Sequence, residues 1–443
     1  MVVGVVVALL VSIGAPMWAT YGARTTADEP HYLLTAISLW EDHDFDVSDE
    51  RAAGRYLDFH EVTLPVQAEI QPDGAQIEPH DPLLPIVLAV PVGLGGWLGG
   101  KLAMAAMAGV LAGLLVVVAR RRLGVRAPIA VTAVLVAGLS PPLAIYGTQI
   151  YPELPAALVT LAGFWWITGP PSRRAAVGAA LAVVALPWLS IKYAPVAAVL
   201  AVGLLLRLWL DGLARRALLV AGGFALAAVT FLVGHHVLYG GWTAYASGSH
   251  FTAGDFSVVG DRPDYAGRSQ RMTGLLVDRY FGLAIWQPAF FAVVPAAAAL
   301  ARRRPSGAVL LLATVAVGWL TATYVALTMA GWWWAGRQTV VVLPLAVLAV
   351  AWWAQRLTPI GRRVLLAAGL LGVAAYAFLV IGVLSHHHTL IFDFDRTYDP
   401  FVRAVRGVLP NGLNQTGTTW ALLGVWSAGL VAWGAWSWRR TDE

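Results

Sequence analysis

The chain has 443 residues, of which 58% are hydrophobic and 12% charged, and its formal net charge is +5. Soluble domains carry about 25% charged residues, and a soluble fold of this size cannot hide so much apolar surface from water. The composition therefore excludes an ordinary soluble protein and predicts an all-α polytopic membrane protein. The absence of cysteine also excludes disulfides, thiolate metal sites and cysteine nucleophiles.

A membrane-crossing helix needs about 20 apolar residues, and the sequence offers about twelve such runs. In chain order they cover 3–20, 102–119, 127–146, 154–168, 175–188, 193–210, 217–238, 281–300, 306–330, 338–355, 364–384 and 419–437. A further apolar run, 82–98, begins at Pro82, and we expect it to be a juxtamembrane helix on the outer face. Counting this run as a crossing would move the arginines that follow residue 119 to the wrong side.

The positive charge sets the orientation of these helices. Nearly all of it is arginine, gathered at every second junction between spans, and the positive-inside rule makes those junctions cytoplasmic. The clusters are Arg120 to Arg122 with Arg126; Arg173 and Arg174; Arg207, Arg215 and Arg216; Arg302 to Arg304; Arg356, Arg362 and Arg363; and Arg439 and Arg440. We therefore expect a multi-pass protein of the plasma membrane with both termini cytoplasmic, and no nucleic-acid partner.

Three long loops then lie outside the cell, at 21–101, 239–280 and 385–418. Fourteen of the 25 acidic residues fall between Asp28 and Asp81, in the first of them. The polar machinery is thus expected on the outer face. We divide the chain into a catalytic unit, 1–240, and a second unit of helices, 241–443.

Two adjacent carboxylates, Asp28 and Glu29, lie where the first span ends and the next helix begins. Asp28 is a plausible N-cap, with Pro30 in the first turn, and this local role is one interpretation. The other is a general base at the membrane surface that takes a proton from an acceptor hydroxyl.

Glu153 lies in a short outer turn between two spans. An acid between apolar helices is costly unless it is paired or hydrated, so it is a candidate functional residue. The alternative is an interfacial acid at the start of the helix that contains Pro155.

Positive charge on the outer side runs against the orientation rule and needs another explanation. Lys192, Arg271 and Arg337 are such residues, and phosphate binding is one explanation, since arginine offers paired donors to phosphate oxygens. Pairing with the outer acids is the other. Trp332 to Trp334, beside Arg337, are either an aromatic belt or a stacking surface for sugar or isoprenoid.

His386, His387 and His388 are adjacent, so their side chains point in different directions and rarely bind one ion. We assign no metal site and no cofactor, although the outer carboxylates leave divalent metal dependence open.

The order of these elements resembles the GT-C class of membrane glycosyltransferases, especially the protein O-mannosyltransferases and the lipid A aminoarabinose transferases. The resemblance rests on Asp28, Glu29 and Tyr32 in a D-E-x-x-Y-like context; on His80-Asp81-Pro82-Leu83, similar to H-P-P-L; on Arg121-Arg122-Leu123-Gly124; and on Glu153, where Asp is commoner. It implies that Asp28 is the catalytic carboxylate, supported by Glu29, and that the donor is a polyprenyl-phosphate sugar. By the same resemblance Tyr32 and His80 join the substrate-binding residues.

The resulting hypothesis is a glycosyltransferase that moves a sugar from a polyprenyl-phosphate donor to a lipid, glycan or protein acceptor on the extracytoplasmic face. Two alternatives stay open at this point. A secondary transporter or lipid-linked-sugar flippase would need charged or broken helices near mid-membrane, for which Pro187 and Pro344 are the only hints. A non-catalytic assembly protein would use the acidic loop for docking.

Overall fold

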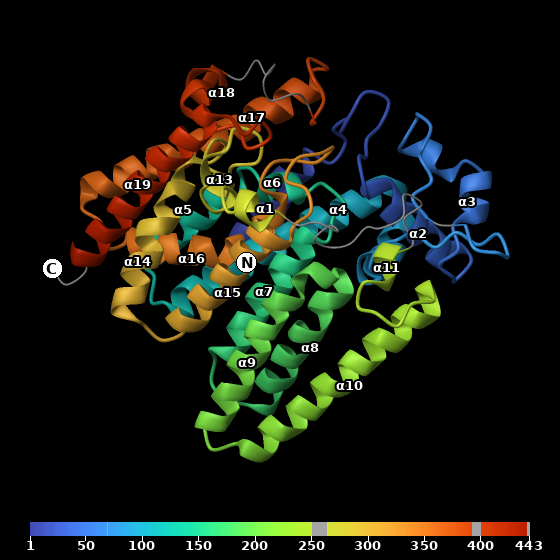
Figure 1. Ribbon diagram of the computed structural model, residues 1–443, viewed down its shortest axis with the longest axis horizontal. Helices are drawn as coiled ribbons and strands as arrows, with labels where there is room; N and C mark the ends of the chain where they lie inside the picture. Colours follow the sequence, from blue (N-terminus) through green and yellow to red (C-terminus); the bar gives the residue numbers. More distant parts are fainter. Residues whose placement is uncertain (69, 250–263, 392–399, 441–443) are drawn as a thin grey trace.

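The computed structural model describes the chain except residues 69, 250–263, 392–399 and 441–443 (Figure 1). Helices are the regular secondary structure of the described residues, and loops and turns join them, with isolated β-bridges around the first outer loop. The α-helices are α1 (Val2–Ser12), α2 (Glu29–Glu41), α3 (Ser48–Ala52), α4 (Leu83–Arg122), α5 (Ala127–Gly138), α6 (Leu143–Tyr146), α7 (Glu153–Ile167), α8 (Arg173–Leu189), α9 (Ala194–Leu210), α10 (Ala214–Tyr239), α11 (Ala246–Ser249), α12 (Tyr265–Arg268), α13 (Arg271–Val277), α14 (Val293–Arg303), α15 (Ala308–Leu320), α16 (Leu343–Ala354), α17 (Pro359–Leu384), α18 (Pro400–Val405) and α19 (Gly417–Arg440). Short 3-10 or π segments include η2 (Ile191–Tyr193), η4 (Thr321–Val325) and η5 (Arg337–Val342).

Among the described residues, six helices are long and apolar enough to cross a membrane. They are Leu83–Arg122, Ile191–Leu210, Ala214–Tyr239, Ala308–Val325, Arg337–Ala354 and Pro359–Leu384. Shorter apolar helices are α1, α5 and α7. The chain is a multi-pass membrane protein, and the expected number of about twelve crossings is not confirmed.

Some of the expected spans are wrong as continuous helices; over 281–300, for example, the helical part begins only at η3 (Pro288–Ala292). Over 3–20 the helix ends at Ser12, and over 127–146 the chain forms α5 and α6 with a break between them. The sequence Pro141-Pro142 falls in this break, and a proline interior to a helix loses a hydrogen bond and clashes with the preceding turn.

The run 82–98 forms the first part of α4, with Pro82 as its N-cap. The backbone leaves helical geometry at Gly95 and Gly96, where Gly96 has a φ of 58°. A glycine adopts this conformation without the steric cost of a side chain. The segment 83–94 is therefore a separate helical arm from the crossing part of α4, close to the boundary that the sequence predicts.

The helices pack around α16, most of which is buried inside the protein rather than exposed to lipid. It contacts α4, α5, α7 and α14, whereas α10 extends away from the body and has few buried residues (Figure 1). Helix α7 also packs against η5, which precedes α16. This contact brings Arg337, the first residue of η5, against Asp28 in the first outer loop.

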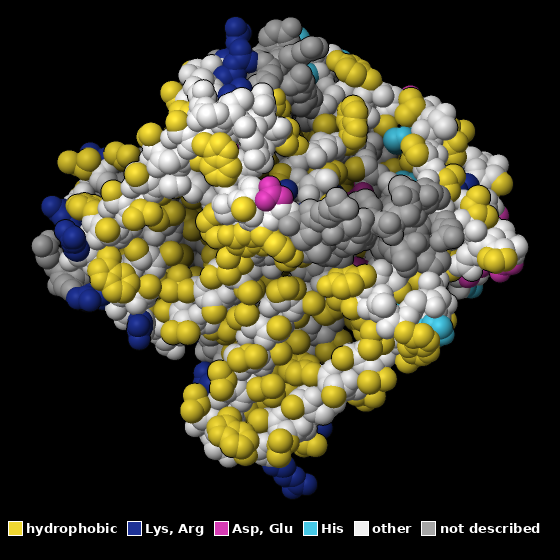
Figure 2. All heavy atoms as spheres, in the orientation of Figure 1, with side chains coloured by type: hydrophobic (Ala, Val, Ile, Leu, Met, Phe, Trp, Pro, Cys, Tyr) yellow, Lys and Arg dark blue, Asp and Glu magenta, His cyan; other side chains and the backbone are white. Residues whose placement is uncertain are grey.

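Charged side chains gather at the edges of the visible face of the molecule. Figure 2 shows Lys and Arg at the left edge and at the lower tip, where α14, α19 and the α9–α10 turn lie, and also at the top, in the region of α18. Acidic side chains appear at the right edge, around α2 and α3.

Candidate functional site

A cavity of about 300 Å³ opens between the first outer loop, the start of α7, η2 and η5. Its polar lining includes Asp28, Tyr32, His80, Lys192 and Arg337. Its apolar lining includes Val196, Val325 and Val341, which belong to helices that are long enough to cross the membrane. Charged groups and an apolar wall thus meet in one cavity.

Arg337 is the residue that joins the two sides of this cavity. Its Nη2 donates to Asp28 Oδ2 at 2.6 Å, and its Nε donates to Glu153 Oε1 at 2.7 Å. The guanidinium carbon lies 4.2 Å from the centre of the Tyr151 ring and 5.1 Å from that of Trp333, within cation–π range. The planar, always charged guanidinium suits this fixed geometry better than a lysine would.

Lys192 is the more accessible cation of the site. Its Nζ donates to Glu153 Oε1 at 2.6 Å, so Lys192 and Arg337 share one carboxylate oxygen. The Lys192 side chain is 24% exposed, whereas those of Glu153 and Arg337 are 1% and 9% exposed. Glu153 therefore positions two cations, of which Lys192 keeps further N–H donors beyond the one that Glu153 accepts.

Asp28 occupies the N-cap position of α2, but its side chain makes no capping hydrogen bond. Burial would raise its pKa, but the charges of Arg337 and His80 outweigh burial and hold the pKa of Asp28 well below its usual range. The preceding residue, Ala27, has a left-handed φ of 48°, which is uncommon for a residue with a side chain. Asp28 is thus an ionised carboxylate at the cavity wall, and its side chain does not cap the helix.

Glu29, next to Asp28, turns away from the cavity. Its Oε1 accepts from the Ile150 N–H at 2.8 Å, and its Oε2 accepts from the Thr26 N–H at 3.0 Å. Lys101 Nζ lies 4.0 Å from the same Oε1. Glu29 is fully buried, and it ties the start of α2 to the turn before α7. This position agrees with a supporting role, carried out through the backbone.

Tyr32 and His80 stack on each other at the cavity wall, with ring centres 4.7 Å apart. Burial lowers the pKa of His80 below its ordinary value, and the nearby Asp28 carboxylate acts in the opposite direction. Beneath them Glu78 accepts from Arg51 at 2.6 Å and contacts His31 Nδ1 at 2.9 Å. Burial opposes the ionisation of Glu78, but the charges of His31 and Arg51 lower its pKa to about 2.

Comparison with solved structures finds the same architecture in ArnT from Cupriavidus metallidurans, whose crystal structure is bound to undecaprenyl phosphate. The alignment covers 97% of this chain and 78% of ArnT, with a TM-score of 0.52 and 17% sequence identity. The chain has the GT-C fold of ArnT. ArnT is a lipid A aminoarabinose transferase, so the resemblance predicted from the motifs is confirmed at the level of the fold. No protein-family profile and no curated protein sequence matches the chain.

Within this GT-C fold, most of the candidate residues come together. Asp28, Tyr32, His80, Lys192 and Arg337 line the cavity, and Glu153 lies behind them. Arg271 does not join them, because its Nη1 donates to the Ala326 carbonyl at 2.6 Å and caps the end of η4. Arg337 comes from the second of the two predicted units, so the cavity draws on both.

The sequence prediction missed three residues that support the cavity: Asp81, His235 and Lys101. Asp81 accepts a hydrogen bond from the Ile191 N–H at 2.9 Å, and its other oxygen lies 2.9 Å from His235 Nε2. The bond to Ile191 holds η2, and therefore Lys192, against the first loop. Lys101 donates to the Arg24 carbonyl at 2.5 Å beside Glu29. A lysine within an apolar run was the available signal for Lys101, whereas nothing local indicates that Asp81 and His235 meet.

The Glu29→Gln variant is expected to unfold at a lower temperature than the parent. The glutamine amide has only one oxygen acceptor, whereas the two oxygens of Glu29 accept from the N–H groups of Ile150 and Thr26. One of these buried N–H groups would lose its acceptor, which costs about 1–3 kcal/mol of stability. Thermal unfolding of the purified protein in detergent measures the effect. Glu61→Gln, at an exposed residue of the same loop, is the matched control. A Glu29 variant as stable as the control would contradict the tethering role.

Proposed function

We propose that the chain is a GT-C glycosyltransferase that transfers a sugar from a polyprenyl-phosphate donor to an acceptor on the extracytoplasmic face of the plasma membrane. The observation that carries the proposal is the cavity in which Arg337 links Asp28 to the Glu153–Lys192 pair. An ionised carboxylate and two cations beside an apolar wall provide what this reaction needs. The undecaprenyl phosphate bound to ArnT, which has the same fold, supports a lipid-linked donor.

In the proposed reaction, Asp28 takes the proton of an acceptor hydroxyl, directly or through one water. The hydroxyl oxygen attacks the anomeric carbon, and the bond from that carbon to the phosphate oxygen breaks. The electron pair stays on the leaving phosphate, whose growing negative charge Lys192 and Arg337 stabilise. One displacement inverts the anomeric configuration and needs no covalent enzyme intermediate.

The remaining groups of the cavity fit a sugar and a lipid chain. The Tyr193 hydroxyl lies at the cavity and has no hydrogen-bond partner among the described residues, so it is available to a sugar hydroxyl. The isoprenoid tail would follow Val196, Val325 and Val341 toward the bilayer. Trp333, also in the lining, offers a face on which a sugar can stack.

The test of this function is transfer from lipid-linked donors. The purified protein is incubated with a panel of radiolabelled polyprenyl-phosphate pentoses and hexoses and with membrane lipid, glycan and peptide acceptors. We expect one donor to yield a labelled product with the inverted anomeric configuration. Absence of transfer from every donor, together with gradient-driven uptake of substrate into proteoliposomes, would replace this proposal with a transporter.

As the pH falls from neutral toward the ordinary pKa range of a carboxyl group, we expect Asp28 to stay ionised. The rate of transfer should therefore not fall through protonation of this residue. The physical reason is that Arg337 keeps the pKa of Asp28 below that range, so the base stays ionised. The pH profile of kcat/KM measures this. An acid limb near pH 6 that disappears in Asp28→Glu would contradict it.

A further inference from the structure

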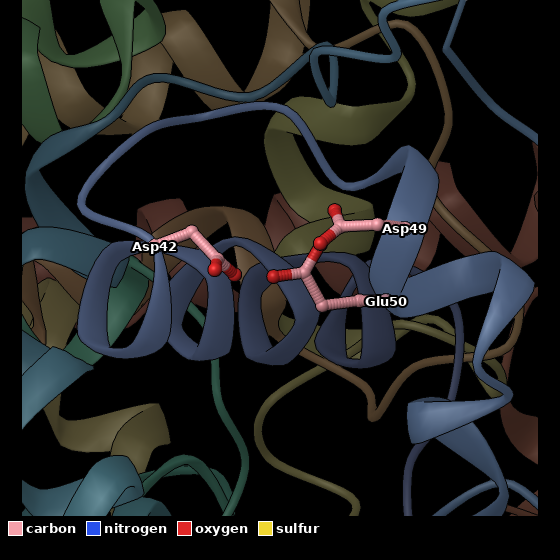
Figure 3. A group of neighbouring side chains, drawn as sticks. All are labelled: Asp42, Asp49 and Glu50. Carbon is pink, nitrogen blue, oxygen red and sulfur yellow. The ribbon is translucent and has the colours of Figure 1, made fainter.

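A second group of carboxylates lies in the first outer loop, away from the cavity residues. Figure 3 shows Asp42 at the end of α2 facing Asp49 and Glu50 of α3. One oxygen of each carboxylate lies within 4.8 Å of one oxygen of each of the others. None of the three forms an ion pair with another described residue, so three carboxyl groups converge without a cationic side chain among them.

Glu50 makes this convergence unusual, because it is buried. The residue is 2% exposed, and neither of its carboxylate oxygens receives a hydrogen bond from the part of the chain that the structure describes. Asp42 and Asp49, in contrast, are exposed to solvent. Withdrawing a carboxylate from water without a donor or a cation is costly, and a cation bound beside Glu50 would offset this cost.

The other acids of this segment already have partners within the protein. Asp44 Oδ1 accepts from Ser38 Oγ and from the Asp46 N–H, each at 3.0 Å. Asp46 Oδ1 accepts from the N–H groups of Ser48 at 3.0 Å and Gln76 at 2.8 Å. These bonds fix the loop that joins α2 to α3 and hold Asp42, Asp49 and Glu50 in position without using their side chains.

We propose that Asp42, Asp49 and Glu50 bind a divalent cation of the calcium class. Calcium takes oxygen ligands at about 2.3–2.6 Å, so two oxygens that share one ion lie at most about 5 Å apart, as these do. The donor set holds no nitrogen or sulfur, which argues against zinc and copper. Calcium also tolerates irregular geometry and accepts water as the remaining ligands, which the two exposed aspartates leave room for.

The ion would join the end of α2 to α3 and so support the wall of the cavity. Arg51, the residue after Glu50, donates to Glu78, and Glu78 contacts His31 on the first turn of α2. Asp28 precedes that turn. The cation therefore acts as a structural clamp on the loop, at a distance from the reacting groups, and its binding is independent of the proposed transfer reaction.

Calcium binding to the purified full-length protein, stripped with a chelator and titrated with calcium chloride in a calorimeter, tests the proposal. We expect one saturable site with a dissociation constant of roughly 10⁻⁴–10⁻³ M, as in other extracellular calcium modules. Glu50→Gln is expected to weaken binding about tenfold or more, since affinity follows the number of charged ligands. Glu61→Gln, an exposed glutamate of the same loop, should bind calcium like the parent.

Asp42→Asn is the second variant, because Asp42 is exposed and its replacement should not disturb folding. It too is expected to weaken binding about tenfold, and it decides the question where Glu50→Gln does not fold. Absence of saturable binding up to about 10 mM calcium, ten times the weakest expected constant, would overturn the proposal. Parent-like affinity in both folded variants would place the ion elsewhere and overturn it equally.

Discussion

Replacing Asp28 with asparagine is expected to lower the rate of sugar transfer by about 10²–10⁴-fold, the usual contribution of a general base. The amide keeps the size of the side chain and an oxygen acceptor for Arg337, but it cannot take a proton from the acceptor hydroxyl. Transfer from the active lipid-linked donor, measured with purified Asp28→Asn and parent proteins, gives the ratio.

The controls separate loss of the base from loss of structure. Asp58→Asn, at an exposed aspartate of the same loop, should transfer sugar at the parental rate. Asp28→Asn should still bind undecaprenyl phosphate, because Lys192 and Arg337 are unchanged. Full transfer by the Asn variant would remove the base assignment.

Arg337→Lys is the second variant with a large expected effect. A lysine reaches Asp28 or Glu153 as a single point charge, whereas the guanidinium donates to both from a fixed fork. We expect transfer to fall by about 10²–10³-fold, as when one donor to a developing negative charge is removed. Single-turnover rates with the active donor measure the change.

Arg337→Met is expected to destabilise the protein as well, because it leaves Asp28 and Glu153 without their shared cation. Breaking a buried ion pair on one side costs about 3–5 kcal/mol. Thermal unfolding distinguishes the two variants, since Arg337→Lys retains the charge and should unfold closer to the parent. Arg363→Lys, at an exposed arginine on a basic junction, is the control. Arg337→Lys transferring at the parental rate would show that the guanidinium is not part of the reaction.

The membrane character and the order of the first motifs were predictable, because they depend on composition and on local runs of sequence. The bounds of the individual helices were less predictable from the sequence. The two glycines that separate 83–94 from the rest of α4 lie near the predicted boundary, whereas Pro141-Pro142 divides a run that apolar length alone presents as one span. Counting apolar residues does not register such breaks, because a span is set by backbone geometry as well as hydrophobicity.

The cavity was predictable in its residue types but not in its pairings. Asp28, Glu153, Lys192 and Arg337 stand out because charge beside an apolar helix is costly unless it is used or paired. In the structure all four take part in ion pairs with one another. For the basic residues this corresponds to pairing with the outer acids, one of the two interpretations that the sequence left open. Arg271 has the same local signature as Arg337 yet caps a helix end, because the distinction depends on the contact between α7 and η5 rather than on local sequence.

The account rests on a polyprenyl phosphate lying against Lys192 and Arg337, with Asp28 facing the sugar. A cryo-electron microscopy map of the parent protein with undecaprenyl phosphate tests this most directly. We expect phosphate density within hydrogen-bond distance of Lys192 Nζ and the Arg337 guanidinium, with the lipid tail along Val196 and Val341. Phosphate density at a separate position, with the cavity lined by Asp28 left to water, would contradict the account.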